Sequence, residues 1–271
     1  MNWVQRQVEA LRLGFKRWRR RNAFFFSLSG APGSGKGTQA ELLSAEGFPM
    51  LGVGDALREQ VRLKTAIGLE AERYMLEGKL VPTPLAMAVI GAALSAPRFD
   101  GGGGLDGAPR HINSVGLLDA QLAQWGCALD LLILLDASDE VIEERCAFRR
   151  LCSNRQCKRY RLAYHLHFDP PAAVCDGSWS GLEEDLSCDL CGSPLVRRAD
   201  DKVETIRERL AVFHQESGPI IEVFAKRGCL CVINVNNEMT PQDVCKEVLA
   251  AVKNARAARR PGKGLKFFLG R

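Results

Sequence analysis

The chain has 271 residues, 46% of them apolar and 25% charged, an ordinary globular composition with room for one large core or two modest domains. The net charge of +5 is small and its excess lies at the two ends, so charge alone does not predict nucleic-acid binding. No apolar run approaches the ~20 residues that span a bilayer, so we expect no transmembrane segment.

Residues 1–22 form a basic leader with seven Lys or Arg against one acid. Large apolar residues recur along it at helical spacing, namely Val4, Val8, Leu11, Phe15 and Trp18. Such a segment is typical of a mitochondrial or other organelle presequence, or of a helix that lies on an anionic membrane surface. The alternative is a solvated helix packed on the core of a cytoplasmic protein.

A glycine-rich stretch from Gly30 to Gln39 follows the apolar run Ala23 to Leu28. Glycines allow the backbone to wrap a phosphate with several N–H groups, Lys36 supplies a cation, and the helix that starts near Thr38 adds its positive end. The alternative is a flexible glycine turn, but the motif GxxxxGK follows a predicted strand and precedes a predicted helix. In that context it predicts a polyphosphate-binding loop.

The next segment predicts mostly helix. Leu51 to Arg58 reads as a short strand, a glycine turn and a helix start capped by Asp55. The pattern from Arg58 to Gly78 is helical, with a break at Gly68 and an end at Gly78. Val81 then opens a helix that runs to about Leu94.

The middle of the chain holds a strand and a helix. Four consecutive glycines predict a loop within Phe99 to Arg110, because glycine loses the most entropy on ordering and packs nothing. Leu129 to Leu135 predicts a buried strand, and Asp139 to Arg150 predicts a helix. Arg145 and Arg149 fall one turn apart on that helix. Their guanidinium groups either bind one phosphate together or belong to an ordinary solvated helix face.

Residues 152–201 change character and predict a small inserted domain, because they combine cysteines, aromatics and turn formers without a long periodic segment. Beyond it we expect a helix over 201–222, a strand over 229–235, a closing helix over 241–258 and a loose basic tail over 259–271. Apolar strands that alternate with helices predict an α/β fold with a parallel sheet covered on both faces.

Several motifs in the same order together resemble the adenylate kinase family, over roughly residues 24 to 250. They are Gly30–Thr38 (the family's GxPGxGKGT), Gly54–Arg58 (GDLLR), Gly78–Pro82 (GKLVP), Leu105–Arg110 (LDGFPR) and Arg197–Asp201, followed by Glu204–Thr205 and Arg207–Leu210. The resemblance implies a P-loop three-layer fold with about five parallel strands, an inserted helical segment that binds the nucleoside monophosphate (NMP), and a small inserted lid. The implied divisions are leader 1–22, core 23–51, 85–147 and 202–255, NMP-binding segment 52–84, lid 148–201 and tail 256–271.

The resemblance also implies the reaction and the residues for it. The γ-phosphate of ATP passes to AMP to give two ADP, with Mg²⁺ on ATP, so catalysis consists of positioning and charge neutralisation without a general base. The implied catalytic residues are Lys36, Arg110, Arg149, Arg198 and Arg209. The implied ATP contacts are Gly33, Ser34, Gly35, Lys36, Gly37, Thr38 and Arg145. The implied AMP contacts are Arg58, Val81 and Arg110. Asp106 is the implied partner of Mg²⁺ through water, and Asp200 and Asp201 order the lid arginines.

Ten cysteines without a secretory signal peptide favour reduced thiols and metal binding over a disulfide scaffold. Zinc-containing members of the family carry four cysteines in the lid, at positions that match Cys152, Cys157, Cys188 and Cys191. The spacing of the second pair is that of a zinc knuckle, and the wider gap in the first pair lies within the range of structural zinc sites. The alternative is a zinc-free lid with spare thiols. His165 or His167 can replace one ligand, and an insertion adds Cys175.

Three acceptor-site positions depart from the family pattern, which usually has Thr, Phe and Gln where this chain has Val53, Ala108 and Ser114. The first and third family residues identify adenine, and one lost hydrogen bond costs about 1–3 kcal/mol of discrimination. AMP then binds more weakly, another monophosphate is accepted, or neighbouring groups substitute.

Three functions stay open from the sequence: an adenylate kinase, a sister NMP kinase that includes the GTP:AMP type, and a nucleotide-sensing or structural protein of the same fold. Lys36 and the six arginines that the resemblance implies favour an enzyme. The acceptor-site changes favour the nucleotide-sensing or structural protein. We expect a monomer whose partners are ATP, AMP and ADP, with no nucleic acid.

Overall fold

The computed structural model describes residues 20, 22–76, 79–154, 156–158, 163–166, 171–175, 186–197 and 201–259. The strands are β1 (Phe24–Gly30), β2 (Met50–Gly52), β3 (Gly102–Asp106), β4 (Leu129–Asp136), β5 (Arg149–Cys152), β6 (Tyr164–His165), β7 (Leu195–Val196) and β8 (Leu230–Asn234). The helices are α2 (Lys36–Ala45), α3 (Val53–Arg62), α4 (Ala66–Leu76), α5 (Thr83–Leu94), α6 (Ile112–Ala123), α7 (Asp139–Phe148), α8 (Ala172–Cys175), α9 (Val203–Lys226) and α10 (Pro241–Ala258), with a 3₁₀ turn at Pro97–Phe99. No helix in these ranges has the length and apolar character needed to cross a membrane.

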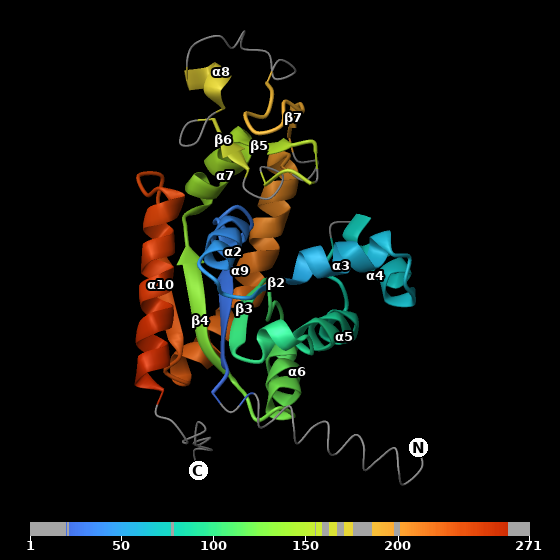
Figure 1. The fold of residues 1–271 in the computed structure, drawn as a ribbon, viewed down its shortest axis with the longest axis vertical. Helices are drawn as coiled ribbons and strands as arrows, with labels where there is room; N and C mark the ends of the chain where they lie inside the picture. Colours follow the sequence, from blue (N-terminus) through green and yellow to red (C-terminus); the bar gives the residue numbers. More distant parts are fainter. Residues whose placement is uncertain are drawn as a thin grey trace.

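A five-stranded parallel sheet in the order β2-β3-β1-β4-β8 forms the centre of the molecule (Figure 1). The pairing places Leu28 of β1 and Gly52 of β2 opposite Asp106 of β3. All carboxyl ends of these strands therefore lie at one edge, where open parallel sheets bind ligands. The predicted α/β class and parallel sheet are confirmed.

Alternate residues of the strands belong to two separate hydrophobic layers, one on each face of the sheet. Phe25 and Leu132 pack with α5, α6 and α9 on one face of the sheet. Phe26 and Ile133 pack with α2 and α10 on the other face. Because successive strand residues point to opposite faces, the near-continuous apolar runs of β1 and β4 fill both layers at once.

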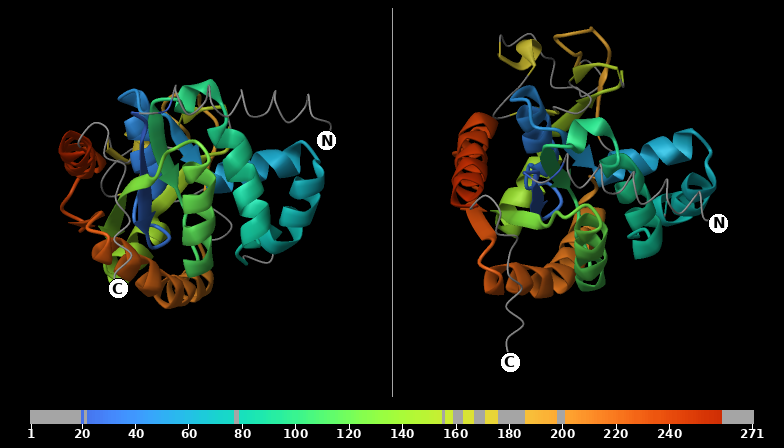
Figure 2. Two further views of the ribbon diagram at one scale, coloured as in Figure 1. Left: turned by 90° about the horizontal axis from the view of Figure 1, so that it is seen from below. Right: turned by 60° about the horizontal axis from the view of Figure 1, so that its bottom comes forward.

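Two insertions extend beyond this core. Helices α3, α4 and α5 stand to one side of the sheet, and β5, β6, β7 and α8 lie beyond its carboxyl edge (Figures 1 and 2). The second group forms an antiparallel sheet in the order β6-β5-β7. Its own small core includes Cys152, Tyr164, Leu166, Leu186 and Leu195. We call residues 148–201 the lid.

The loop predicted for the glycine run is wrong, because Gly102–Asp106 is strand β3, which lies between β2 and β1 in the sheet. A side chain there has no room. A Cβ on Gly103 would lie 2.4 Å from the Pro49 carbonyl oxygen, and one on Gly104 would lie 2.3 Å from Met50 Sδ and 2.6 Å from the Phe26 ring. Large neighbouring side chains fill the space that the glycines leave, so propensity alone fails at this strand.

Two helix boundaries also differ from prediction. The first helix begins at Val53 with Gly52 as its N-cap, so Asp55 lies inside the first turn. The break comes before Ala66 rather than at Gly68, which sits within α4. A Cβ on Gly68 would lie 2.1 Å from the Gln60 carbonyl oxygen, so this glycine permits close contact between α3 and α4. The end predicted at Gly78 lies outside the described residues.

The helix predicted over Asp139 to Arg150 ends early, at Phe148. Arg149 adopts an extended conformation and begins β5, which pairs with β6 and β7. Arg145 and Arg149 therefore do not share a helix face, and the one-turn alignment predicted for them is wrong. The helix after the lid runs on to Lys226, whereas the closing helix has the predicted bounds.

Candidate active site

The phosphate loop joins the end of β1 to the start of α2. Gly33 and Gly35 have φ angles of 89° and 99°, the left-handed region that favours glycine. A Cβ on Gly33 would lie 2.7 Å from Cys146 Sγ, so α7 packs directly against this loop. Ser34 of this loop is buried. Helix α2 begins at Lys36, followed by Gly37 and Thr38, and the free N–H groups of such a first turn can bind an anion.

Lys36 folds back over the loop. Its Nζ donates to the carbonyl oxygens of Gly30 at 2.6 Å and Ala31 at 2.7 Å. Burial lowers the pKa of Lys36 to about 8, Asp106 opposes that shift, and three arginines add to it. Lys36 therefore lies near three guanidinium groups and one carboxylate, and this excess of positive charge suits a polyanionic ligand.

Asp106, at the end of β3, faces the start of α2, since a Cβ on Gly37 would lie 4.0 Å from its Oδ2 atom. Burial raises the pKa of this carboxyl, while the nearby charges of Lys36 and Arg110 act in the opposite direction. Arg110 donates from Nε to the Gly107 carbonyl oxygen at 2.9 Å, which turns its side chain back over the loop after β3. These groups lie together at the carboxyl edge of the sheet.

Arg58, on α3, contributes to the same region from the segment that precedes α5. Its Nη2 atom lies 2.5 Å from Asp55 Oδ1. Arg58 and Asp55 both act on the pKa of Asp106, and Arg58 also acts on that of Arg110. The structure therefore places the charge of the α3 pair within electrostatic range of the residues at the end of β3.

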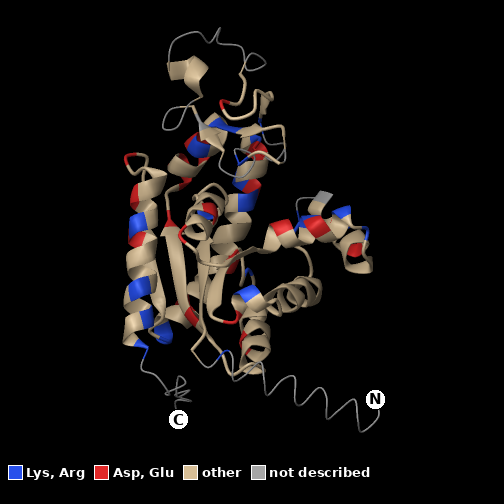
Figure 3. Ribbon diagram, viewed as in Figure 1, with Lys and Arg blue, Asp and Glu red and all other residues tan. Residues whose placement is uncertain are grey.

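Arg149 joins the lid to the core. Its guanidinium binds the buried Asp201 carboxylate at two points, one of them Nε to Oδ2 at 2.8 Å. The positive charges of Arg149 and of Arg209 in α9 both lower the pKa of Lys36, so both lie within electrostatic range of the phosphate loop. Lys and Arg positions along the ribbon gather where α7, β5 and the start of α9 meet (Figure 3). The predicted Arg198 and Asp200 lie outside the described residues.

Arg145 takes a different position. Its Nη2 donates to the Asn236 carbonyl oxygen at 2.5 Å and its Nε to Asn237 Oδ1 at 3.3 Å. These contacts hold the guanidinium against the loop that follows β8. Arg145, a predicted ATP contact, therefore lies beside the β8 loop, whereas the predicted catalytic residue Arg149 binds Asp201.

The residues at the three altered acceptor positions all make contacts within the protein's own fold. Val53 is buried in the core layer with α5 and α6, as is Ala108, whose carbonyl oxygen accepts from the Ser27 hydroxyl. Ser114 Oγ donates to the His111 carbonyl oxygen at 2.6 Å and caps α6. Val81 packs against the same core layer from the segment before α5.

The four lid cysteines come together. The Sγ atoms of Cys152, Cys157, Cys188 and Cys191 all lie within 4.8 Å of one another. Two of these distances are 3.4 Å, between Cys152 and Cys191, and 3.7 Å, between Cys157 and Cys188. A tetrahedral site with Zn–S bonds of about 2.3 Å requires S···S distances of about 3.8 Å, whereas a disulfide requires about 2 Å. The donor set and spacing therefore fit zinc.

Backbone and side-chain groups support this cluster. The N–H of Gly192 donates to the Cys188 carbonyl oxygen at 2.7 Å, which closes the knuckle. Tyr164 is fully buried, and its hydroxyl lies 3.5 Å from Cys188 Sγ. Cys175 is exposed on α8 and is not in the cluster. The side chain of His165 and the whole of His167 lie outside the described residues.

Sequence reasoning missed two polar pairs near the site. Asp55 was assigned to a helix cap, yet it pairs with Arg58; the spacing of three residues on one helix was the available signal. His111 Nδ1 lies 2.8 Å from Glu216 Oε2, which links the start of α6 to α9. No short-range pattern joins residues so far apart in the chain.

A phosphate loop after a parallel strand, faced by a carboxylate and by arginines from separate segments, defines a nucleotide-dependent phosphotransferase. A family model described as adenylate kinase matches residues 28–229, and the chain belongs to that family. The adenylate kinase of Methanocella arvoryzae is 40% identical over 84% of this chain and 98% of its own length. Those of Caldicellulosiruptor bescii and Archaeoglobus fulgidus are 37% and 34% identical, over 83% and 84% of this chain and 97% of their own lengths.

Proposed function

We propose that this phosphotransferase moves the γ-phosphate of ATP to AMP and yields two ADP. The observation that carries the proposal is the convergence of Lys36, Asp106 and Arg110 at the carboxyl edge of the sheet, with the charges of Arg149 in β5 and Arg209 in α9 within electrostatic range of Lys36. This charge set suits a transfer between two polyanions. The names of the curated relatives support the same reaction.

Each side of the site then has its own role. The phosphate loop and Lys36 hold the β- and γ-phosphates of the donor. Arg58 and Arg110 hold the acceptor phosphate, because guanidinium binds phosphate through two parallel hydrogen bonds and keeps its charge when buried. Arg149, Arg198 and Arg209 neutralise the transferring group, and Arg145 contacts the donor base. Closure of the lid and the NMP-binding segment excludes water, the competing acceptor.

Asp106 would hold Mg²⁺ through water molecules, since this ion prefers oxygen ligands and keeps much of its hydration shell. When bound, the ion would supply positive charge that offsets the charge of the phosphates. The position of the Asp106 carboxylate beside Gly37, at the start of α2, supports this role. Asp106→Asn should therefore weaken the Mg²⁺ dependence of turnover.

The lid cysteines Cys152, Cys157, Cys188 and Cys191 would hold a structural zinc ion. A domain with so few buried apolar residues gains rigidity from four thiolates at one tetrahedral centre. In this proposal zinc fixes the lid loops in place and does not contact the reacting phosphates.

A matrix of donors and acceptors tests the proposed reaction. ATP or GTP is paired with AMP, CMP, UMP or GMP, and diphosphate formation is followed for each pair. The proposal expects ATP with AMP to give the highest kcat/KM. Nucleotide binding without turnover for every pair would overturn it.

A sister NMP kinase is the second candidate, and one observation favours it. At positions 53 and 114 the chain offers a buried valine and a serine already engaged in capping α6, so neither has a free group for an adenine contact. Comparable kcat/KM for a second acceptor in the matrix would select this candidate, while a strong AMP preference would show that other groups read the base.

A further inference from the structure

Helices α6 and α9 pack on the same face of the sheet, and two polar contacts join them. His111, at the start of α6, contacts Glu216 of α9, with Nδ1 2.8 Å from Oε2. Farther along α6, Asp119 pairs at 2.8 Å with Arg227, which follows α9. The contacts come in the same order along both segments, so the two helices run in the same direction. The His111 contact lies nearer the carboxyl edge of the sheet, because α6 follows β3.

The contact between His111 and Glu216 is a hydrogen bond with a defined direction. A carboxylate only accepts, so Nδ1 carries the hydrogen and donates it to Glu216. The two side chains are 33% and 30% exposed, so water screens the contact only in part. The backbone of His111 is fixed as well, because the Ser114 hydroxyl accepts from its N–H at 3.3 Å and donates to its carbonyl oxygen at 2.6 Å. His111 is therefore held both by its own helix and by α9.

The residue before His111 is the proposed acceptor arginine. Arg110 donates from Nε to the Gly107 carbonyl oxygen at 2.9 Å, so its side chain follows the backbone of this short segment. The Ser27 hydroxyl of β1 holds the first part of the segment, because it donates to the Ala108 carbonyl oxygen. Helix α9 holds the other end at His111. A shift of His111 would therefore move Arg110.

Helix α9 presents Arg209 on the same side as Glu216. The two residues are about two helical turns apart, so their side chains share one face of the helix. Burial lowers the pKa of Arg110 and the nearby charge of Arg209 lowers it further, while Asp106 acts in the opposite direction. Two such like charges repel each other unless a phosphate binds both. The contact between His111 and Glu216 holds their two segments together against this repulsion.

The backbone of α9 is weakened close to this contact. Pro219 lies inside the helix, three residues after Glu216. Proline has no N–H, so the carbonyl oxygen of Gln215 loses the helical hydrogen bond that another residue at position 219 would donate. The bond from His111 therefore ties α9 to α6 at a place where the helix has less support of its own.

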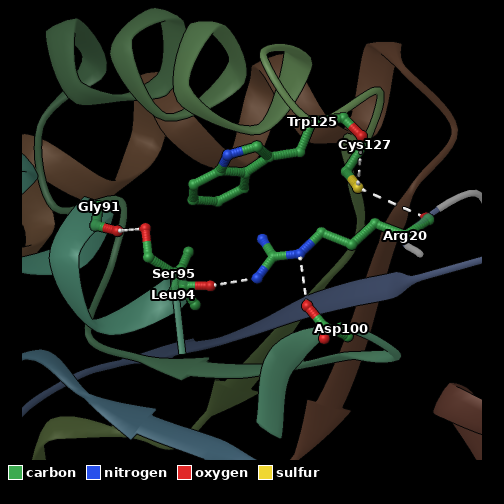
Figure 4. A network of polar contacts seen from close by, with 7 residues as sticks. All are labelled: Arg20, Gly91, Leu94, Ser95, Asp100, Trp125 and Cys127. Atoms are coloured by element: carbon green, nitrogen blue, oxygen red, sulfur yellow. Dashed lines mark hydrogen bonds and ion pairs between the residues drawn. The ribbon is translucent and has the colours of Figure 1, made fainter. Parts of the chain in front are cut away.

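The far end of α6 is anchored independently (Figure 4). Trp125, two residues beyond α6, lies under the guanidinium of the fully buried Arg20, at 4.3 Å from the ring centroid. Arg20 also donates from Nη2 to the Leu94 carbonyl oxygen at 2.6 Å and lies 3.2 Å from Asp100 Oδ1. Helix α6 should therefore keep its place when its contact with α9 is removed, and the effect should be confined to the end beside the acceptor arginine.

We propose that His111 and Glu216 form a positioning pair that sets the place of Arg110 relative to Arg209, and thereby the affinity for the acceptor phosphate. The inference rests on the proposed function, because it concerns the acceptor side of that reaction. Glu216 acts through His111 and the backbone of Arg110, which it holds ready for the phosphate. The donor loop and Lys36 belong to β1 and α2. Loss of the pair should therefore weaken acceptor binding and leave donor binding unchanged.

Calorimetric titration of the full chain with AMP and, separately, with ATP tests the proposal. We expect Glu216→Ala to weaken AMP binding about three- to tenfold and to leave ATP binding within about twofold of the wild type. In steady-state assays the KM for AMP should rise by a similar factor while the KM for ATP stays unchanged. A merely structural role would lower the midpoint of thermal unfolding without separating the two nucleotides.

Two further variants assign the effect to the pair. His111→Ala should weaken AMP binding as Glu216→Ala does, and the double variant should be no worse than either single one, because all three lack the same hydrogen bond. Glu216→Gln keeps an oxygen that accepts from Nδ1, so it should recover most of the lost affinity. If Glu216→Ala misfolds by circular dichroism, His111→Ala provides the same test.

The matched control is His214→Ala. His214 Nε2 lies 2.9 Å from Asp139 Oδ1, which makes a second histidine–carboxylate pair on α9, but this pair joins α7 and its histidine is 56% exposed. AMP binding should not change in this variant. Equal AMP affinity in the wild type and Glu216→Ala, or equal losses for AMP and ATP, would overturn the proposal. A wild type that binds AMP without transfer would contradict the proposed function alone, because the binding measurement does not require turnover.

Discussion

The Arg149 guanidinium and the Asp201 carboxylate form a two-point ion pair that ties the first residue of β5 to the residue that precedes α9 by two positions. Asp201 is buried, whereas the Arg149 side chain is 21% exposed and its charge lies within electrostatic range of Lys36. The pair therefore fixes both borders of the lid. It also holds one arginine in the orientation that charge neutralisation requires.

Asp201→Asn should lower kcat about 10- to 100-fold and leave the fold intact, because an amide cannot hold the guanidinium as a two-point ion pair. Steady-state kinetics with circular dichroism measures both effects. Glu143→Gln is the matched control, since Glu143 binds Arg207 at two points between α7 and α9 on the exposed surface. An equal loss of kcat in both variants would remove the special role of the buried pair.

Binding of a nucleoside triphosphate at pH 8 should take up protons. The pKa of Lys36 is about 8, below its usual 10.5, because the group is buried and lies near three arginines. About half of the unliganded molecules then carry a neutral Lys36 at this pH, and phosphate oxygens restore the charge. Calorimetry in buffers of different ionisation enthalpy measures the uptake. Lys36→Met should abolish it, and unchanged uptake in that variant would contradict the assignment.

The protein purified without chelator should contain about one equivalent of zinc. Cys188→Ser should lose the metal and lower the midpoint of thermal unfolding, because Cys188 contributes both a thiolate and the carbonyl oxygen of the knuckle. Cys175→Ser is the control, since this exposed lid cysteine is outside the cluster. Elemental analysis that finds less than about half an equivalent in the wild type would count against the site.

Asp130 should make the free energy of unfolding fall as pH rises from about 4 to 6. Burial raises its pKa from 3.8 to about 6, so the folded chain binds this proton more tightly than the unfolded chain. Ionisation of the buried carboxyl then costs up to about 3 kcal/mol. The difference in the free energy of unfolding between Asp130→Asn and the wild type, measured by urea unfolding, should shift by about 2–3 kcal/mol in favour of the variant from pH 4 to pH 7. Parallel pH curves for the two proteins would refute this.

The sequence predicted the parallel sheet, the phosphate loop and the closing helix because each depends on a local pattern. The apolar runs of β1 and β4 and the glycine spacing before α2 carry that information within a few residues. Cys188 and Cys191 likewise lie within one knuckle, and their approach to the first cysteine pair follows from the family motif.

The failures have one physical cause, which is that distant groups decide the local structure. Gly103 and Gly104 form a strand because Phe26, Phe99 and Met50 fill the space beside them. Arg149 leaves its helix because β5 pairs with β6 and β7 and because Asp201 binds the guanidinium. Local propensity does not include either effect, since both involve residues far away in the sequence.

In the proposed reaction, Lys36 and the surrounding arginines direct a phosphoryl group from one nucleotide to another. Incubation of the protein with AMP, Mg²⁺ and ATP labelled on its γ-phosphate tests this transfer. We expect the label on the β-phosphate of newly formed ADP, two ADP for each ATP consumed, and a rate about 10²-fold or more lower in Lys36→Met. Label released as free phosphate, or an equal rate in the Lys36→Met variant, would contradict it.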